Sequence, residues 1–514
     1  MTLIRLIVFA ACCFSFVLFP ANLSGAYSYG GVESALIDSS RTKDPEIKAL
    51  SGALAHYVMG TIYDNFGDTE AAVAQYKKAL AYKKDIGEIY LNLGSDFLLL
   101  GKFDEASETL NQAVVLDPES VKSYLLLAII HTAKGEFEKA QQQYEEALRH
   151  DPENLKVLTF LSDLFVVQQK LDKAAEVYEK ILRIRKDDAF IYFNLGIIYS
   201  KLDLLDKAEE NLQKAIEVDE DYFEAQMVLG FIYEVEGKYA EAIKQYKKVA
   251  EVDELNRDAH VRLGQLYYRM GRTDDAIAEN RILMQLDTHS PEPYLRNFSI
   301  YVSGKDYGKA QEVLDEALQK GISTAVIYAS LGYLASLEKD YKKAVDYYTV
   351  AAEKDPASAI YRFYSATALD RSGRREEALK VLEEIVSGEG AIAEAYNYLG
   401  YLYAEEGRDL DRAVTLIKKA LAIDPANGAY VDSLGWAYYK KGMMDEALEE
   451  LNKAAELIPD DAVIRDHLGD VYFAGGELEK AAREWEMAIK LDPGDKKISK
   501  KLEKIKVKLK NKSK

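Results

Sequence analysis

The chain has 514 residues, more than the roughly 250–300 at which a single hydrophobic core stops growing, so several domains or an open-ended repeat array are expected. Hydrophobic residues make up 48% of the chain and charged residues 30%, with only 10 prolines, which is typical of long amphipathic helices and excludes a disordered polymer. The formal net charge of -20 argues against general nucleic-acid binding, because that binding depends on basic side chains that neutralise phosphates.

Residues 1–26 have the pattern of a secretory signal peptide. Arg5 forms a short basic region, an apolar run extends from Leu6 to Phe19, and the small residues Ser24-Gly25-Ala26 form a cleavage site. The apolar run is shorter than the roughly 20 residues needed to span a bilayer. We therefore expect export and cleavage after Ala26, with an uncleaved membrane anchor as the alternative.

Both cysteines of the chain lie inside this predicted signal, at Cys12 and Cys13. A cleaved chain would have no thiol for a disulfide, a metal site or a nucleophile. The run from Phe9 to Cys12 loosely resembles a bacterial lipobox, so lipidation of Cys12 is a second alternative for the N-terminus.

After a lead-in segment over residues 27–52, one pattern recurs at a spacing of 34 residues. A Leu-Gly pair is followed, twelve residues after the glycine, by an alanine. The pairs are Leu93-Gly94, Leu195-Gly196, Leu229-Gly230, Leu263-Gly264, Leu331-Gly332, Leu399-Gly400, Leu434-Gly435 and Leu468-Gly469. The alanines include Ala106, Ala140, Ala174, Ala208, Ala242, Ala276, Ala310, Ala344, Ala378, Ala447 and Ala481. Such small residues remove bulk where two helices cross, so that their backbones can approach closely.

This period and pattern resemble those of the tetratricopeptide repeat family. The resemblance implies an all-α, right-handed superhelical solenoid of about thirteen helix-turn-helix repeats with a C-terminal capping helix. We assign repeats 1–7 to residues 53–290 and repeats 8–13 to residues 291–495. At two places Asn297-Phe298 and Ser365-Ala366 stand where Leu-Gly is expected, so less close helix contact is expected there. The repeat that starts at Pro291 is interpreted as an irregular unit of a continuous array, with a hinge as the alternative.

Residues 496–514 form a lysine-rich tail in which Ile498, Leu502, Ile505 and Leu509 recur at helical spacing. We expect a helix that caps the last repeat, since solenoids need a polar terminal surface. The alternative is a basic foot that associates with a membrane surface, the cell wall or a partner.

No motif for catalysis or metal binding appears in the sequence. His56, His131 and His260 occupy positions that are aromatic in sister repeats, so they are expected to pack, whereas His150, His289 and His467 are isolated. There is no H-E-x-x-H, P-loop or G-x-G-x-x-G motif, and the repeats leave no room for a catalytic domain. We therefore expect no enzymatic activity, no catalytic residue, no metal site and no cofactor.

In tetratricopeptide proteins, particular positions of each first helix face a concave groove that binds peptides or helices. The resemblance places the following residues at those positions: Phe193, Ile197, Met227, Phe231, Tyr268, Tyr333, Phe363, Asn397, Tyr401, Asp432, Trp436, Tyr439, Asp466, Asp470 and Phe473. Trp436 is expected to be presented for binding, while Tyr438 falls at a buried position and is expected to pack. The alternative is that these groove residues pack against facing repeats.

The function that this reading favours is a non-catalytic scaffold or adaptor that binds partner polypeptides in its groove. The signal and the style of the repeats suggest the periplasm of a bacterial envelope, and residues 397–442 resemble the C-terminal repeats of envelope tetratricopeptide lipoproteins, some of which are adaptors for periplasmic proteases. One alternative is a structural assembly factor for an exopolysaccharide, pilus or outer-membrane machine. Another is a glycan or peptidoglycan binding module. Protein partners are expected in the first two cases, and nucleic acid in none.

Overall fold

The computed structural model of the chain describes residues 44–512. The predicted signal peptide of residues 1–26, the possible lipidation of Cys12 and most of the lead-in segment lie outside the described residues. They stay predictions.

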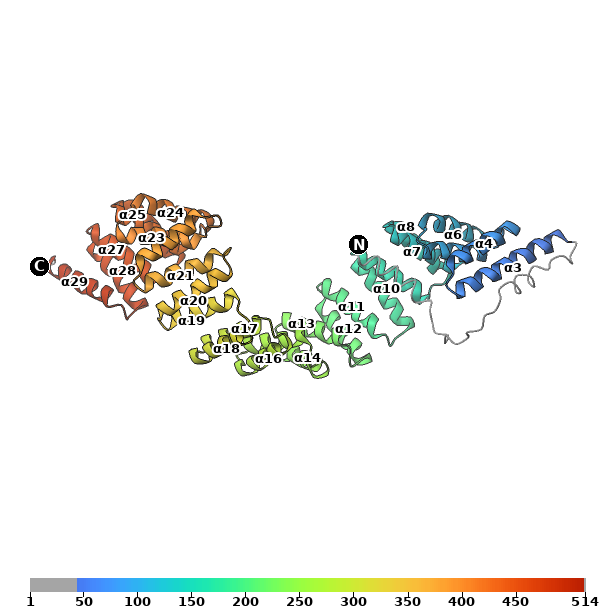
Figure 1. Cartoon of the computed structure of the whole chain (residues 1–514), viewed down its shortest axis with the longest axis horizontal. Coiled ribbons are helices and arrows are strands. Elements are labelled where there is room, and N and C mark those ends of the chain that lie inside the picture. Colours follow the sequence, from blue (N-terminus) through green and yellow to red (C-terminus); the bar gives the residue numbers. More distant parts are fainter. Residues whose placement is uncertain (1–43, 513–514) are drawn as a thin grey trace. The chain divides into compact units, whose positions relative to one another are not determined.

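All regular secondary structure in residues 44–512 is helical and consists of thirteen consecutive helix pairs followed by one last helix (Figure 1). The expected all-α repeat solenoid is confirmed. The first six pairs are α3 (Pro45–Asn65) with α4 (Thr69–Tyr82), α5 (Gly87–Leu99) with α6 (Phe103–Leu116), α7 (Val121–Ala133) with α8 (Phe137–His150), α9 (Leu155–Val167) with α10 (Leu171–Ile184), α11 (Ala189–Lys201) with α12 (Leu205–Val218), and α13 (Phe223–Val235) with α14 (Tyr239–Val252).

The remaining pairs continue the same alternation. They are α15 (Arg257–Arg269) with α16 (Thr273–Leu286), α17 (Glu292–Ser303) with α18 (Tyr307–Gln319), α19 (Ala325–Leu337) with α20 (Tyr341–Lys354), α21 (Ala359–Arg371) with α22 (Arg375–Ser387), α23 (Ala393–Glu406) with α24 (Leu410–Ile423), α25 (Gly428–Lys441) with α26 (Met444–Leu457), and α27 (Ala462–Ala474) with α28 (Leu478–Leu491), before α29 (Lys496–Lys512). The chain forms two compact units, which divide between Ala259 and His260 within α15. The predicted boundary at residues 290 and 291 falls between α16 and α17, inside the second unit.

Small residues hold the two helices of each pair close together. All eleven alanines that the repeat pattern singled out are fully buried. Gly332 faces the Tyr348 ring so closely that a Cβ atom there would lie 2.7 Å from it. A larger residue at position 332 would have to displace this buried ring, which is why the pattern keeps glycine at the crossing.

The repeats with Asn297-Phe298 and Ser365-Ala366 in place of Leu-Gly still pack against the helices next to them. In α17, the buried Asn297 accepts a hydrogen bond of 2.8 Å from the side-chain amide of Asn280. In α21, Ala366 is fully buried and α21 packs against both α20 and α22. Helix contact at residues 365 and 366 is therefore kept, and whether it is less close than in a Leu-Gly repeat stays a prediction.

Helix α29 takes the place that the first helix of a further repeat would have. Ile498, Leu502 and Ile505 are buried against α28, as the apolar stripe predicted. The capping role of this helix is thus confirmed. Association of its exposed lysines with a membrane or cell wall stays a prediction.

The three histidines expected to pack do so. His56 stacks on Tyr82 with ring centres 5.6 Å apart, and His260 is buried with Nδ1 2.7 Å from a carboxylate oxygen of Glu279. His131 is half-buried, with Nδ1 2.8 Å from Glu136. Their contacts are with neighbouring helices of the array and serve its stability.

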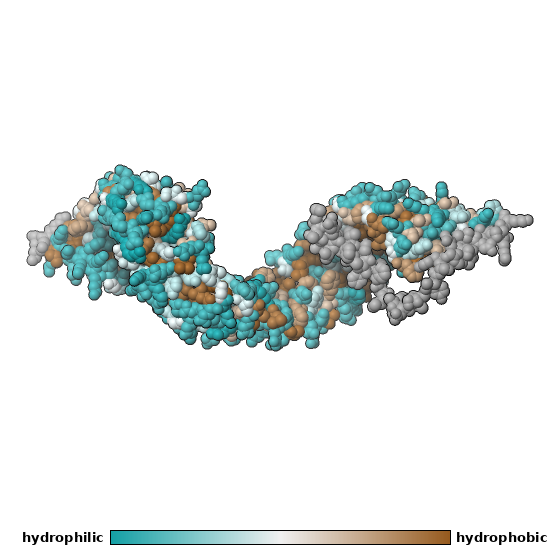
Figure 2. All heavy atoms as spheres, viewed as in Figure 1, coloured by the Kyte–Doolittle hydropathy of each residue, from teal (hydrophilic) through white to brown (hydrophobic). Residues whose placement is uncertain are grey.

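Hydrophobic side chains also reach the surface. Figure 2 shows them in patches among hydrophilic residues on the face in view, and the most exposed large ones include Leu255, Phe66 and Val115. Within residues 44–512, no helix is long and apolar enough to span a membrane.

Candidate binding site on the first helices

The predicted groove residues all lie on the first helix of a pair, as the repeat register requires. Phe193, Ile197, Met227 and Phe231 lie on α11 and α13 of the first unit, and the others lie on first helices of the second unit. Their exposure differs greatly. Phe231, Tyr268, Tyr333 and Phe473 are exposed, Asp432 and Trp436 are buried, and the other nine are half-buried.

Trp436 packs and is not presented to solvent. Its side chain is only 8% exposed, and its ring stacks on His467 at a centroid distance of 4.1 Å. The indole Nε1 donates a 2.6 Å hydrogen bond to Glu405, and the Lys440 ammonium lies over the ring. The expectation that Trp436 is displayed in the groove is therefore wrong, because first helices of adjacent repeats cover it from both sides. Tyr438 packs against two core clusters, as expected.

His467, which the sequence left isolated, is the partner of Asp432. Its Nδ1 lies 2.9 Å from a carboxylate oxygen of Asp432, and both side chains are buried. Burial lowers the pKa of His467, but the Asp432 carboxylate raises it more, so that the pKa lies above its ordinary value. This pair fastens α27 onto α25.

The next repeat uses the same geometry. Lys501 of α29 donates hydrogen bonds of 2.8 Å and 2.7 Å to Asp466 and Asp470. Asp466 and Lys501 are 35 residues apart, as are Asp432 and His467. The acidic spots expected at the C-terminal end of the groove are therefore neutralised by the chain's own basic side chains, and they are not free to bind a cationic partner.

An open hollow of about 730 Å³ lies between α19 and α21, with α20 beneath it. A volume of this size lies within the range typical of ligand pockets. The residues that line it are Val326, Ala329, Ser330, Tyr333, Ser336, Tyr341, Tyr348, Ile360, Tyr361, Tyr364, Thr367, Ala368 and Arg371. Of the predicted groove residues, Tyr333 alone belongs to this lining.

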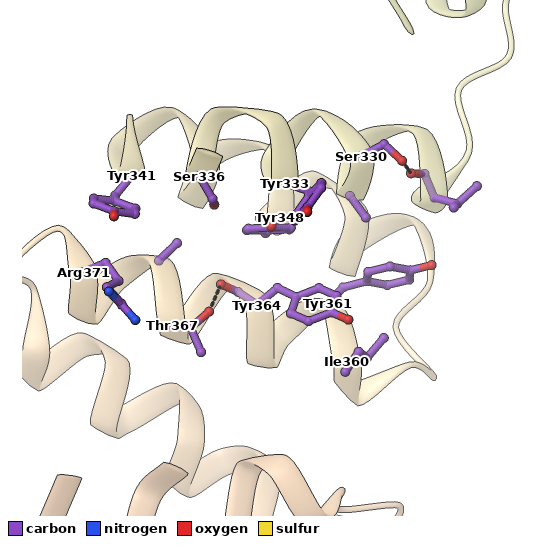
Figure 3. Close-up of a pocket in the computed structure, with 13 residues that line it drawn as sticks. Ser330, Tyr333, Ser336, Tyr341, Tyr348, Ile360, Tyr361, Tyr364, Thr367 and Arg371 are labelled. Carbon is purple, nitrogen blue, oxygen red and sulfur yellow. Dashed lines mark hydrogen bonds between the residues drawn. The ribbon is translucent and has the colours of Figure 1, made fainter. Parts of the chain in front are cut away.

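The hollow runs along both helices (Figure 3). Ser330 and Ile360 lie toward one end, Tyr341 and Arg371 toward the other, and tyrosine rings occupy the middle. Tyr348 forms the floor, because it is 5% exposed and its ring centre lies 5.4 Å from that of Tyr364. The site is thus a trough with aromatic walls and a cation at one end.

Helices α19 and α21 make little direct contact across the trough, as do most first helices of adjacent repeats in residues 44–512. In contrast, α23 and α25, two repeats further on, pack directly against each other. On the facing side of α21, Thr367 and Ala368 present short side chains toward the space. Larger residues at these two positions would fill the trough.

The charge within the trough comes from Arg371. It is exposed, and among the described residues no carboxylate lies within ion-pairing distance of it. The neighbouring Asp370 is already engaged, since it accepts hydrogen bonds of 2.6 Å from Arg375 and 2.8 Å from Tyr398. Burial raises the pKa of both Tyr348 and Tyr361, so these phenols stay neutral at physiological pH.

Most residues of this site are not singled out by any pattern in the sequence. Tyr361, Tyr364 and Arg371 occupy positions that vary between repeats, so the repeat pattern does not single them out. The 35-residue separation could have revealed the Asp432–His467 pair, had acids and bases been matched between neighbouring repeats. Within residues 44–512, no group of three or more His, Cys, Asp or Glu side chains is arranged to hold a metal ion.

Comparison with known families agrees with this geometry. The family described as "Tetratricopeptide repeat" matches residues 233–291 and 365–428, and a second family of the same description matches residues 404–466. These segments are similar to tetratricopeptide repeats. Residues 32–260 match a third family, the "Cilia and flagella-associated protein 70 C-terminal domain". Tetratricopeptide proteins typically serve as scaffolds for protein interactions.

The relatives share only parts of their length with this chain. Protein O-mannosyl-transferase TMTC1 of Homo sapiens is 30% identical over 143 residues, which are 28% of this chain and 16% of the relative. Small glutamine-rich tetratricopeptide repeat-containing protein 2 of Mycosarcoma maydis is 29% identical over 96 residues, 19% of this chain and 27% of the relative. The chain therefore spans well under a third of the length of either protein.

Two solved structures resemble the chain over most of its length. Naa15/Naa10 bound to HypK-THB gives a TM-score of 0.44 at 20% identity and covers 85% of this chain and 68% of its own. The Cut9-Hcn1 hetero-tetramer of APC/C gives a TM-score of 0.41 at 16% identity, and the match covers 92% of this chain and 95% of the other.

Proposed function

We propose that this tetratricopeptide protein is a non-catalytic scaffold that binds segments of partner proteins on its first helices, with the trough between α19 and α21 as the main contact. The observation that carries the proposal is the exposed aromatic lining of this trough. Tyr333 is 48% exposed and Tyr364 is 37% exposed, although both lie within a hollow that a ligand could fill. Tyrosine and arginine are over-represented among the residues that dominate binding energy at protein interfaces.

We further propose that the scaffold works in the bacterial envelope, after export directed by residues 1–26. Two features of the sequence support this location: the signal-like leader, and the absence of cysteine after residue 13, which suits an oxidising compartment. An adaptor for a periplasmic protease is one role that fits. Cell fractionation followed by N-terminal sequencing of the native protein checks the location and the cleavage, because an envelope chain that begins after Ala26 supports both, and a chain confined to the cytosol that retains residue 1 contradicts both.

Site-specific photocrosslinking tests the binding role. A photoreactive phenylalanine analogue is placed at Tyr333 in the trough or, as the matched control, at the exposed Glu353 on the second helix α20. The protein is illuminated in an extract of the cells that produce it. We expect a discrete crosslinked partner at position 333 and none at position 353. Equal crosslinking at both positions, or none at position 333, would contradict the proposed site.

A further inference from the structure

The trough between α19 and α21 has a chemistry that selects its ligand, if it binds protein segments as proposed above. We propose that it recognises a short extended peptide segment in which an aromatic or branched aliphatic side chain is accompanied by an aspartate or glutamate. The apolar side chain lies between the tyrosine rings, and the carboxylate pairs with Arg371. Three features of the trough lead to this assignment.

The first feature is exposed apolar surface concentrated at one place. Val326, Tyr333 and Tyr364 are all large hydrophobic residues with at least 37% exposure, and all three line the trough. An apolar side chain placed among them removes this surface from water, which is the main favourable contribution to most protein association. Aromatic faces also stack on an incoming ring.

The second feature is an uncompensated cation. Among the described residues, no acidic side chain lines the trough, although the chain as a whole carries a formal net charge of -20. The guanidinium of Arg371 is permanently charged, and its fork of N–H donors matches a carboxylate. A ligand carboxylate therefore gains a charge-assisted bidentate hydrogen bond at a site where the protein provides no competing acid.

The third feature is a set of donors suited to a peptide backbone. The hydroxyls of Ser330 and Thr367 already donate to carbonyl oxygens of their own helices. In contrast, the phenol groups of Tyr333, Tyr361 and Tyr364 have no hydrogen-bond partner within residues 44–512. These phenols can donate hydrogen bonds to the backbone carbonyl oxygens of an extended segment. In such a segment these oxygens have no partner from its own secondary structure.

The length of the trough sets the length of the segment. From Ile360 to Arg371 the wall of α21 extends about 16 Å at the rise of an α-helix. This distance matches about five residues of extended chain. We therefore assign the carboxylate to a side chain within two or three residues of the apolar anchor.

A random dodecapeptide library displayed on phage tests this inference with the full-length protein. The library is selected on the wild-type chain and on Arg371→Glu, and the enriched peptides are then synthesised with blocked ends so that only side chains carry charge. We expect the wild-type protein to enrich peptides that combine an aromatic or aliphatic residue with a nearby acid. We expect Arg371→Glu to lose that acidic preference.

Binding of the synthetic peptides is then measured by fluorescence anisotropy. Arg371→Gln should weaken binding by about tenfold or more, as expected for loss of a charge-assisted hydrogen bond, and Tyr333→Ala should weaken it comparably. Arg483→Gln is the matched control, since Arg483 is an exposed arginine on the second helix α28 that forms no ion pair within residues 44–512. It should change nothing. Circular dichroism confirms that each variant is folded.

The outcomes separate this inference from the proposed function. If the enriched peptides lack acids, or bind Arg371→Gln as tightly as wild type while Tyr333→Ala weakens them, the trough binds peptides but the acidic selectivity is refuted. If Tyr333→Ala and Arg371→Gln both leave binding unchanged, the peptides bind elsewhere and the site is refuted. If no peptide is enriched above the empty support, the protein has no general peptide-binding face and both proposals fail.

Discussion

Asp96 is expected to make the N-terminal repeats less stable as the pH rises. It lies on α5, is only 3% exposed, and has one carboxylate oxygen without a hydrogen-bond partner. Its neighbour Asp64 on α3 accepts a 2.5 Å hydrogen bond from the hydroxyl of Tyr76. Burial and the charge of Asp64 raise the pKa of Asp96 to about 8. Asp96→Asn should therefore stabilise these repeats at neutral pH, because the amide is neutral and can donate to Asp64.

The size of the effect follows from proton linkage. Between the ordinary pKa of 3.8 and the folded value of about 8, the folded repeats hold a proton on Asp96 that the unfolded chain has released. The contribution of Asp96 to the free energy of unfolding is therefore complete below pH 3.8 and falls by about 1.4 kcal/mol per pH unit until about pH 8. The asparagine variant has no such loss. The stability advantage of Asp96→Asn over wild type should grow by about 2.7 kcal/mol between about pH 5 and pH 7. This corresponds to about 100-fold in the unfolding equilibrium constant.

Hydrogen–deuterium exchange measured by mass spectrometry is the suitable assay. Tryptophan fluorescence would not report on α5, because both tryptophans lie in the second unit. Comparing variant and wild type at the same pH cancels the intrinsic pH dependence of exchange. We expect the protection of α3 and α5 in Asp96→Asn, relative to wild type, to rise about 100-fold over this range. Asp172→Asn, at an exposed aspartate of α10, is the control and should show no change. If the protection of α3 and α5 in Asp96→Asn relative to wild type stays constant with pH, the claim that Asp96 is buried and protonated is refuted.

Three further predictions concern the second unit. Trp436→Ala should lower the free energy of unfolding of the second unit by about 3–5 kcal/mol, as for other buried aromatic residues. Urea denaturation followed by circular dichroism measures this change, and a value below about 0.5 kcal/mol would mean that the indole is exposed. Because the pKa of His467 is raised on folding, its contribution to stability is complete below about pH 6.5 and is lost as the pH rises through the folded value. Melting temperatures should therefore fall over this range in wild type but not in His467→Asn, and identical pH profiles would count against the pair. Lys501→Met should speed exchange in α29 by lowering its opening free energy by about 1–3 kcal/mol, because Asp466 and Asp470 lose their donor; unchanged exchange would show that the cap does not depend on this contact.

The architecture was predictable because it depends on residues that recur. Alanines such as Ala106 and Ala344 are fully buried wherever the 34-residue pattern places them. Their role depends only on the partner helix of the same repeat, which lies a fixed number of residues away. The capping helix was predictable for the same reason, since Ile498 and Leu502 continue the apolar spacing.

The binding site was less predictable because it depends on how successive first helices face each other. Trp436 occupies a groove position, yet His467 of the next repeat covers it. Arg371 and Tyr364 acquire their setting from the gap between α19 and α21, and no periodic signal encodes that gap. Position within a repeat therefore indicates which face a residue occupies, but not whether a neighbour covers it.

The most direct test of the binding face is hydrogen–deuterium exchange of the full chain with and without the partner recovered by crosslinking at Tyr333. The structure predicts slower exchange in the peptides that cover α19 and α21, and no change in those covering the outer second helix α26. Tyr333→Ala should abolish the slowing. Protection confined to second helices, or protection of α19 and α21 that persists in Tyr333→Ala, would contradict the claim that this trough is where the scaffold holds its partner.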